Sequence, residues 1–249
     1  MPEPIRTPTR ITIVGAAGRM GQALLTASRE PGSPCRVVAA LVIPDSPAIG
    51  TETGVPGLKY SADLAAGLAA CDVVVEFTMS SSTALLAARV AAAGKPLLSG
   101  TTGLDAAATA ALDAAAARIA VLHSPNMSLG VAVLAALVER AARALPEFAV
   151  ALDEVHHVHK KDTPSGTAVR LAEAVVSGRG GKSPEIRSQR RGEVVGEHTA
   201  TFSGPGERLE LAHKAADRRV FAVGALRAAA WLAARPAGRY RLADMLGIR

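Results

Sequence analysis

The sequence predicts an α/β protein in which a mainly parallel sheet covered by helices is followed by a smaller α+β region. Apolar, β-branched segments of strand length alternate with alanine-rich segments of helical spacing over the first half of the chain. After residue 145, longer β-rich segments joined by glycine turns replace this alternation. A histidine-rich stretch at 154–168 opens the second region, which is organised around it.

The composition excludes several classes of protein. With 249 residues, 49% of them hydrophobic, the chain is long enough to bury a large core and too apolar to be disordered. No apolar run has the length of a membrane span, and the Pro-rich first ten residues lack the apolar core of a signal peptide. Cys35 and Cys71 lie beside predicted strands and indicate buried thiols in a reducing compartment, so we expect a cytoplasmic protein.

The charge distribution favours a small anionic ligand. The formal net charge is +6, but the basic residues are scattered and aromatic residues make up only 3% of the chain, too few for nucleic-acid stacking. Residues 156–219 hold twelve Lys/Arg and eight Asp/Glu, which fits an anionic substrate in this region. We predict no nucleic-acid and no membrane partner.

The first predicted strand, Arg10–Val14, is followed at once by a glycine turn and by a helix through about Ser28. The turn reads Gly-x-x-Gly-x-x-Gly at 15–21, so that its first glycine allows the bend and its second lets a pyrophosphate approach the backbone. The helix N-terminus can bind that pyrophosphate, and an ordinary tight turn is the alternative. We predict a Rossmann-type dinucleotide-binding domain, with cofactor contacts at Gly15, Ala16, Ala17, Gly18, Arg19 and Met20.

The second predicted strand, 36–43, ends without a residue that reads the adenosine ribose. An acidic residue there favours NADH because it accepts hydrogen bonds from the ribose hydroxyls, whereas an arginine favours NADPH because it pairs with the 2′-phosphate. Val42 and Ile43 do neither, and Asp45 follows only after Pro44. We expect Val42 to contact the cofactor without selecting it, so that NADH and NADPH both work.

The remaining elements of the first half continue the strand–helix alternation. After a loop over 44–60, strands are predicted at 71–77, 94–99 and 119–123. One helix is predicted to follow residues 78–82 and to end at 93, and another covers 105–118. Polar turns follow two of these strands, and ligands in such sheets bind at the carboxyl ends of strands. These turns share an edge with the glycine turn and extend the predicted cofactor site to Gly100, Thr101, Thr102, Ser124, Pro125, Asn126 and Met127.

A helix over 129–145 leads into the second region. A strand over 148–155 precedes the histidine-rich stretch, a flexible loop covers 178–184, and β-rich segments of antiparallel character follow at 186–202 and 207–213. A helix over 220–234 and the residues 240–246 return to complete the first domain. The predicted division is a dinucleotide-binding domain of 1–127 with 214–249, and a substrate-binding domain of 128–213.

The histidine-rich stretch reads Glu-Val-His-His-Val-His-Lys-Lys-Asp-Thr-Pro-Ser-Gly-Thr-Ala and lies where a strand ends and a helix begins. Ser165 or Thr167 can cap that helix, and its first N–H groups can bind an anion. Lys160 adds a cation, so the site suits a substrate with carboxylate groups. The histidines offer proton transfer near neutral pH.

Two other interpretations of this stretch remain open. His157 and His159 alternate onto one strand face with Asp162 nearby, as zinc ligands do, but Lys160 opposes a second cation, so we predict no metal. A solvated basic loop is the usual fate of a charge run. However, the residues Thr-Pro-Ser-Gly-Thr at 163–167 are typical of a turn and of an anion-binding site, and a solvated loop does not require them.

Over nearly its whole length the sequence resembles the 4-hydroxy-tetrahydrodipicolinate reductase (dihydrodipicolinate reductase) family. The pattern His-His-x-His-Lys-x-Asp-x-Pro-Ser-Gly-Thr at 156–167 is highly specific to that family. Further matching segments are 14–21, 76–78, 100–103, 125–130, 154–168, 196–199 and 207–214. Val42 and Ile43 depart from the family's usual acidic–basic pair, and the stretch 177–186 is short.

The resemblance implies that His156 is the proton donor and acceptor and that Lys160 is a second proton donor. The implied substrate contacts are His157, Lys160, Ser165, Gly166 and Thr167. The implied reaction is hydride transfer from NADH or NADPH to the dihydropyridine ring that forms when a 4-hydroxy dicarboxylate loses water, in diaminopimelate and lysine biosynthesis. The implied architecture is a Rossmann domain with an α+β domain whose open mixed sheet builds a homotetramer.

Two rival classes of function remain. One is another two-domain nicotinamide enzyme that acts on an amino acid, such as an aspartate or homoserine dehydrogenase, which would share the Rossmann start without the histidine-rich stretch. The other is a non-catalytic NAD-dependent sensor, which would bind the cofactor without turning over any diacid.

Overall fold

The computed structural model describes residues 7–248, which separate into two compact units. The first unit comprises the residues up to Met127 together with Phe221–Met245, and the second comprises Ser128–Val220 with the residues after Met245. Within residues 7–248, no helix combines the length and the apolar character that a membrane span needs.

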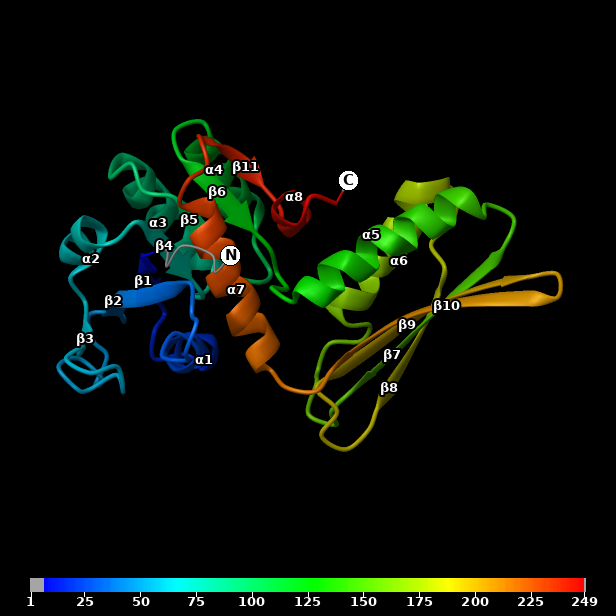
Figure 1. Cartoon of the computed structure of the whole chain (residues 1–249), viewed down its shortest axis with the longest axis horizontal. Coiled ribbons are helices and arrows are strands. Elements are labelled where there is room, and N and C mark those ends of the chain that lie inside the picture. The colour runs from blue at the N-terminus through cyan, green and yellow to red at the C-terminus, as the bar shows by residue number, and fades with distance from the viewer. Residues whose placement is uncertain (1–6, 249) are drawn as a thin grey trace, which may run out of the picture. The chain divides into compact units, whose positions relative to one another are not determined.

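The first unit contains a seven-stranded sheet in the order β11-β6-β5-β4-β1-β2-β3 (Figure 1), in which every pairing is parallel. The order reverses between β1 and β4, which is the switch point where ligands bind in such sheets. The α/β prediction is therefore confirmed, and β11 returns the end of the chain to this sheet beside β6. The strands are β1 Thr9–Val14, β2 Cys35–Leu41, β3 Tyr60–Ser61, β4 Val73–Glu76, β5 Leu97–Ser99, β6 Ala120–His123 and β11 Gly238–Tyr240.

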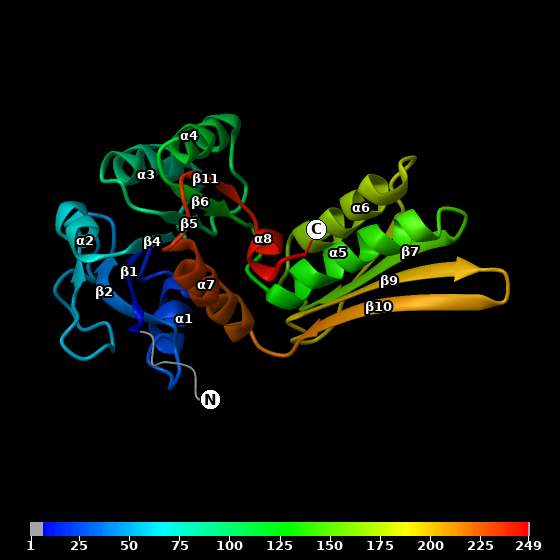
Figure 2. The ribbon, with the colours of Figure 1, turned by 45° about the horizontal axis from the view of Figure 1, so that its top comes forward.

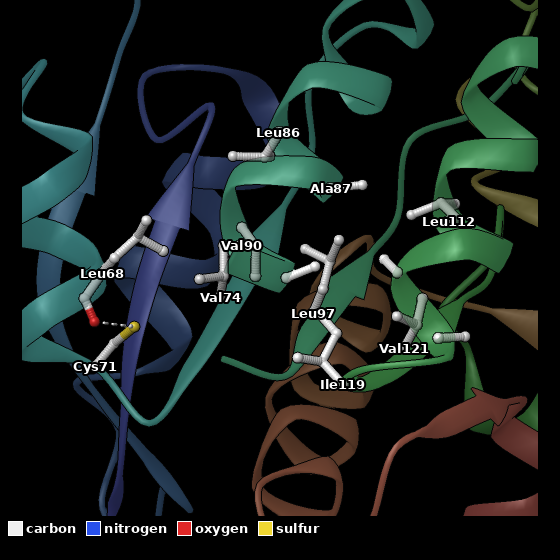
Figure 3. Packing of buried hydrophobic residues seen from close by; sticks show 13 residues of the cluster. Leu68, Cys71, Val74, Leu86, Ala87, Val90, Leu97, Leu112, Ile119 and Val121 are labelled. Atoms are coloured by element: carbon white, nitrogen blue, oxygen red, sulfur yellow. Dashed lines mark hydrogen bonds between the residues drawn. The ribbon is translucent and has the colours of Figure 1, made fainter. Parts of the chain in front are cut away.

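Helices cover both faces of this sheet. Figure 3 shows Leu86, Val90 and Leu112 packing on Val74, Leu97 and Val121, which places α3 and α4 over one face. α7 lies on the opposite side (Figure 2), and the Cys35 thiol donates to the Leu226 carbonyl at 3.2 Å, which links β2 to α7. The helices are α1 Arg19–Ala27, α2 Leu64–Ala70, α3 Ser80–Ala92, α4 Ala106–Ala116, α7 Arg219–Leu232 and α8 Leu242–Leu246.

The short helix α2 was not predicted from the sequence. Gly67 lies inside it, and glycine in a helix interior normally argues against helix. Here a Cβ at Gly67 would stand 3.0 Å from a Leu41 methyl carbon and 3.2 Å from Cγ2 of Thr12, so glycine lets α2 pack closely on the sheet. The Thr12 hydroxyl donates to the Gly67 carbonyl at 2.7 Å. The packing that selects this helix is tertiary and leaves no local pattern.

The second unit contains a four-stranded mixed sheet in the order β10-β9-β7-β8, with α5 and α6 together on one face (Figure 2). Among its described residues no helix covers the other face. The strands are β7 Ala149–His156, β8 Glu185–Arg190, β9 Gly196–Gly204 and β10 Glu207–Ala215, and the helices are α5 Leu129–Ala144 and α6 Gly166–Arg179.

The antiparallel character predicted for 186–202 is wrong for its first part. β8 pairs parallel with β7, because the chain returns between them through α6 as a crossover helix. β9 is antiparallel to β7 and β10. The predicted loop at 178–184 also begins too early, since α6 continues to Arg179. A Cβ at Gly178 would lie 2.3 Å from the Glu139 carbonyl oxygen, so glycine serves the close packing of α6 on α5.

The strand β7 carries its functional residues on its covered face. Leu152, Glu154 and His156 alternate along the strand and are all buried, with Leu152 in the core beneath α5 and α6. The same alternation buries His198 and Phe202 of β9. The period of the strand thus places a carboxylate and an imidazole at the end of an apolar row.

Candidate active site

Four strands of the first unit end side by side at the edge where its polar turns lie. The register pairs Val14 with Glu76, Glu76 with Ser99, and Ser99 with His123. The glycine turn and the two later polar turns therefore leave the sheet at one edge, as the alternation of strands and helices predicted.

The glycine turn fits a pyrophosphate. Gly15 has φ of +85°, and a Cβ there would lie 2.2 Å from the Phe77 carbonyl oxygen, so the turn requires glycine. α1 begins after Gly18, which offers no side chain to cap the first N–H groups of the helix. Arg19 is exposed beside them. These N–H groups and Arg19 would hold the pyrophosphate of a nicotinamide dinucleotide.

A buried carboxylate ties the neighbouring strand ends together. Glu76 Oε1 accepts hydrogen bonds from the hydroxyls of Thr78, of Thr83 at 2.8 Å and of Thr101 at 2.8 Å. The Thr101 hydroxyl oxygen in turn accepts the Thr78 N–H at 3.0 Å. His123 Nε2 donates to the Thr101 carbonyl at 3.0 Å, and burial lowers the pKa of this imidazole. One network thus holds the ends of β4, β5 and β6.

The predicted cofactor residues are not equally accessible. Gly15, Met20, Val42 and Asn126 are half-buried, and the exposed ones are Ala17, Gly18, Arg19, Thr102 and Pro125. The buried ones offer a ligand mainly backbone atoms and are Ala16, Gly100, Thr101, Ser124 and Met127. Ile43, the second residue after β2, is exposed, and the first charged side chain after this strand is that of Asp45, so no charged side chain stands directly at the strand end.

In the second unit, Ser165 is the residue that caps α6. Its hydroxyl accepts the Ala168 N–H at 3.2 Å, which decides between the two candidates the sequence offered. A Cβ added at Gly166 would meet no atom within 4 Å, so α6 has open space beside its first residue. Gly166 is exposed and Thr167 half-buried. This arrangement suits a carboxylate at the N-terminus of the helix.

Lys160 and its loop are held by two side chains. Lys160 Nζ lies 2.8 Å from Asp162 Oδ1, and this hydrogen bond lowers the pKa of the Asp162 carboxyl. Arg190 of β8 donates to the Asp162 carbonyl at 2.6 Å, to the Thr163 hydroxyl at 2.8 Å and to the Lys160 carbonyl at 3.4 Å. The guanidinium thereby fixes the backbone that carries the predicted substrate-binding lysine.

Glu154 lies at the centre of this group. Its Oε1 accepts the Ser165 N–H at 3.2 Å and Arg190 Nη1 at 3.1 Å, and its Oε2 accepts the Nδ1–H of His156. Burial opposes ionisation, but a hydrogen bond from Ser188 and the charges of His156 and Arg190 outweigh it and lower the pKa of Glu154. The carboxylate is therefore ionised at neutral pH.

Two buried imidazoles lie edge to face here, with the ring centroids of His156 and His198 5.0 Å apart. Burial lowers the pKa of His156 in spite of the Glu154 charge, and burial with the nearby His156 charge lowers the pKa of His198 to about 4. His198 Nε2 lies 3.2 Å from the Ser165 hydroxyl. A Cβ at Gly196 would stand only 3.0 Å from His156 Nε2, so glycine leaves room for the ring.

The other two histidines of the stretch lie outside the buried group. Arg218 Nη2 donates to His157 Nε2 at 3.1 Å, and since a guanidinium cannot accept, His157 carries its proton on Nδ1. The His159 side chain is 75% exposed, and its Nε2 lies 3.7 Å from a carboxylate oxygen of Glu193, which is also exposed. His157 therefore remains next to the site, whereas His159 points to solvent.

Metal binding through the residues considered from the sequence is not supported by their placement. Within residues 7–248, the His, Cys and carboxylate side chains close enough to share an ion are Glu154, His156 and His198, with ligand atoms within 4.8 Å of one another. His157, His159 and Asp162 do not form such a group. Both oxygens of Glu154 already accept hydrogen bonds, and the Arg190 cation opposes a second cation there.

Several residues of the site were missed by reasoning from the sequence. A signal for Glu154 was present in the sequence, because it lies two residues before His156 and the alternation of a strand places both side chains on one face. His198 lies in the matching segment 196–199, but nothing in the sequence places it beside β7. Arg190 and Arg218 lie far from the stretch, and only folding brings them to it.

Two family models together match almost the whole chain. They are described as "Dihydrodipicolinate reductase, N-terminus", matching residues 9–127, and "Dihydrodipicolinate reductase, C-terminus", matching residues 130–246.

The chain belongs to the dihydrodipicolinate reductase family.

Curated relatives from this family are similar over nearly their full length. The 4-hydroxy-tetrahydrodipicolinate reductase of Xanthomonas euvesicatoria is 48% identical over 95% of this chain and 97% of its own. The protein of the same name from Methylocella silvestris is 46% identical over 96% and 97% of the two chains.

A solved structure supports the fold. A dipicolinate-bound dihydrodipicolinate reductase from Paenisporosarcina sp. TG-14 superposes with a TM-score of 0.78 at 19% identity, covering 96% of this chain and 100% of that one. An amine dehydrogenase from Mycobacterium smegmatis has a lower TM-score of 0.58 at 14% identity, covering 95% and 96% of the two chains. At these identities the two likenesses show that the fold is shared.

Proposed function

We propose that this chain catalyses the NAD(P)H-dependent reduction of 4-hydroxy-tetrahydrodipicolinate to tetrahydrodipicolinate in diaminopimelate and lysine biosynthesis. The observation that carries the proposal is the neutral, buried His156 held by Glu154 next to Lys160 and the open N-terminus of α6, in a chain that both family models match. Residues 1–127 and 214–249 would bind the cofactor, and residues 128–213 the substrate.

The substrate's two carboxylates would be bound by cations and by a helix N-terminus. One carboxylate would meet the first turn of α6 at Gly166 and Thr167. The other would pair with Lys160, taking the place of the Asp162 carboxylate. Ser165 contributes as the cap of α6, since its N–H already donates to Glu154 and its hydroxyl already bonds Ala168 N–H and His198. His157 can donate from Nδ1, because Arg218 occupies its Nε2.

The proton step is assigned to His156. A reduced nicotinamide, when bound, supplies the hydride, and the ring then needs one proton to reach the tetrahydro product. His156 would give that proton and return to the neutral imidazole. A dianionic substrate beside the ring favours its protonated form, so substrate binding would be accompanied by proton uptake. Lys160 would act as the second proton donor.

Neither nicotinamide dinucleotide is selected strongly by the described residues after β2. We expect the kcat/KM values for NADH and NADPH to differ by less than about 10²-fold, since one charged contact contributes only a few kcal/mol. Val42→Glu should shift the preference toward NADH, and Ile43→Arg toward NADPH. Steady-state kinetics with both cofactors at one ionic strength tests this. A larger wild-type preference would mean that Asp45 or Arg19 reads the 2′ position.

The open face of the four-stranded sheet would form the contact between subunits of a cytoplasmic homotetramer. The residues on that face include Asp153, Glu197 and Thr199, which are only partly exposed although no helix in the described part of the unit covers them. Light scattering after size exclusion would give a mass near four chains, and a monomer would contradict the assembly.

The decisive assay couples this chain to enzymatic synthesis of the 4-hydroxy substrate from pyruvate and aspartate semialdehyde. Oxidation of NADH or NADPH that requires both the chain and the coupling enzyme supports the proposed reaction. Tight cofactor binding with no oxidation would favour the sensor class. Oxidation with aspartate semialdehyde alone would favour an amino-acid dehydrogenase.

A further inference from the structure

The two nitrogens of His156 have different surroundings. Nδ1 is hydrogen-bonded to a carboxylate that is itself fully enclosed. Nε2 has no hydrogen-bond partner within residues 7–248 and is not one of the fully enclosed polar atoms, unlike Nδ1 of His198. The imidazole therefore has one nitrogen fixed by the protein and one open to a small molecule.

Glu154 can serve only as an acceptor toward His156. Its Oε1 is taken by the Ser165 N–H and by Arg190, and both of these are obligate donors. The ionised carboxylate must then accept from Nδ1, so the neutral ring carries its proton on Nδ1 and a lone pair on Nε2. A protonated ring has its labile proton on Nε2, facing away from Glu154.

We propose that Glu154 is a positioning residue for the reduction, which fixes His156 as the Nδ1–H tautomer and makes Nε2 the atom that delivers the proton to the substrate ring. The inference rests on the proposed function and deepens it by assigning the atom and the residue that orients it. In the step itself the Nε2–H bond breaks, a bond from that proton to the substrate forms, and His156 returns to the neutral Nδ1–H imidazole. The hydride comes from the nicotinamide, so no further reactant is needed.

The substitution Glu154→Gln removes the negative charge and keeps the shape of the side chain. If the amide oxygen of Glu154→Gln faces Arg190 and the Ser165 N–H, its NH₂ faces Nδ1 and forces the proton onto Nε2 of the neutral ring. If the amide is turned, its NH₂ meets two donors. Either arrangement removes the wild-type pairing without removing volume.

The test is a double-mutant cycle in the full-length enzyme. Glu154→Gln should lower kcat by about 10²-fold, within the range for losing a correctly positioned acid. It should leave the dissociation constant of NADPH, measured by nucleotide fluorescence, unchanged. In the double variant with His156→Gln, kcat should equal that of His156→Gln alone, because Glu154 acts through that ring. The matched control is Glu139→Gln, whose carboxylate pairs with Arg143 on the surface.

The pH profile gives a readout that a purely structural role would not move. Lys160, Arg190 and His198 also face the His156 ring and stay unchanged in the variant. Without the Glu154 charge, the proton is held less tightly, so the limb on which kcat falls with rising pH should shift to lower pH. The proposal would be overturned if the high-pH fall of kcat did not shift. It would also be overturned if the loss of kcat in the double variant equalled the product of the two single losses.

The tautomer itself can be observed in the wild-type enzyme, which removes any dependence on how a variant folds. ¹⁵N spectra of histidine-labelled protein should show His156 protonated at Nδ1 above its pKa, with the resonance assigned by its loss in His156→Gln. A proton on Nε2 would contradict the inference. If wild type shows no turnover, the proposed function fails, whereas normal turnover with a normal Glu154→Gln variant defeats only this inference.

Discussion

Each unit buries a glutamate at or near the end of a strand, and the donors around the two carboxylates differ in kind. Glu76 is held by three threonine hydroxyls, and its Oε2 has no partner within residues 7–248. Both oxygens of Glu154 are bonded, and its partners include a guanidinium and an imidazole. Burial alone therefore does not determine which kind of donor surrounds a glutamate.

The difference separates two uses of a buried glutamate side chain. Neutral hydroxyls at Glu76 join loops that would lie around a cofactor, so we expect its loss to change stability and loop position. Ionic partners at Glu154 control the protonation of a histidine, so we expect loss there to change chemistry. Variants in the Glu76 network should therefore alter stability, and variants in the Glu154 network should alter kcat.

The largest expected effect lies in the second unit. His156→Gln should reduce kcat by about 10²–10⁴-fold, because the ring loses its positioned acid. Cofactor affinity should stay nearly intact, since the glycine turn belongs to the other unit. Steady-state kinetics and nucleotide titration measure both quantities, and Glu139→Gln serves as the control. A near-normal kcat would remove His156 from the role.

The buried imidazoles should make the free energy of unfolding depend on pH. An unfolded histidine takes up a proton below about pH 6.5, whereas His198 in the folded chain does so only near 4. Between these values the unfolded state binds more protons, so stability is complete above this window and falls as the pH drops through it, by on the order of 3 kcal/mol.

Denaturant unfolding followed by circular dichroism at a series of pH values measures this dependence. His198→Gln should flatten the curve between those pH limits, and the remaining slope should come from His123, His156 and His213, whose pKa values burial also lowers. An equally steep curve in the variant would show that His198 titrates normally in the folded chain.

A smaller effect is expected for inhibitor binding. Pyridine-2,6-dicarboxylate is planar and should compete with the substrate, and Lys160→Ala should weaken it by about 1.5–3 kcal/mol, the range for a charged hydrogen bond. Lys182→Ala, an exposed lysine of the same unit, is the control. The titration is repeated with excess zinc, because the inhibitor chelates metals. Inhibition that is unchanged in Lys160→Ala would mean that this lysine does not face the carboxylates.

The smallest effect should appear in the first unit. Thr101→Val removes one donor to Glu76 and the acceptor of the Thr78 N–H, so it should cost about 1–3 kcal/mol of unfolding free energy. Its kcat with saturating NADPH should remain within a few-fold of wild type. Thr109→Val, on the exposed face of α4, should lie within about 0.5 kcal/mol of wild type. A loss of kcat at unchanged stability would break the distinction between the two networks.

Local pattern was sufficient for most of the fold. Most strand and helix types between β1 and β6 follow from hydrophobic period and from alanine-rich segments, but the short strand β3 begins at Tyr60, inside the loop that was predicted over 44–60. Local pattern was insufficient for α2, which contains a glycine selected by close packing, and for the parallel pairing of β8. A strand's period shows which side chains share a face but not the direction of its partner.

By itself the sequence determined the glycine turn, the cap of α6 to within two residues, and the histidine-rich stretch at 154–168, because these depend on residue types at short fixed spacings. Tertiary structure alone decided that Arg190 and His198 surround Glu154 and His156, and that Thr83 and Thr101 share Glu76. Those contacts join residues many positions apart. Which charge is desolvated, and by which donors it is satisfied, is fixed only when the strands pair.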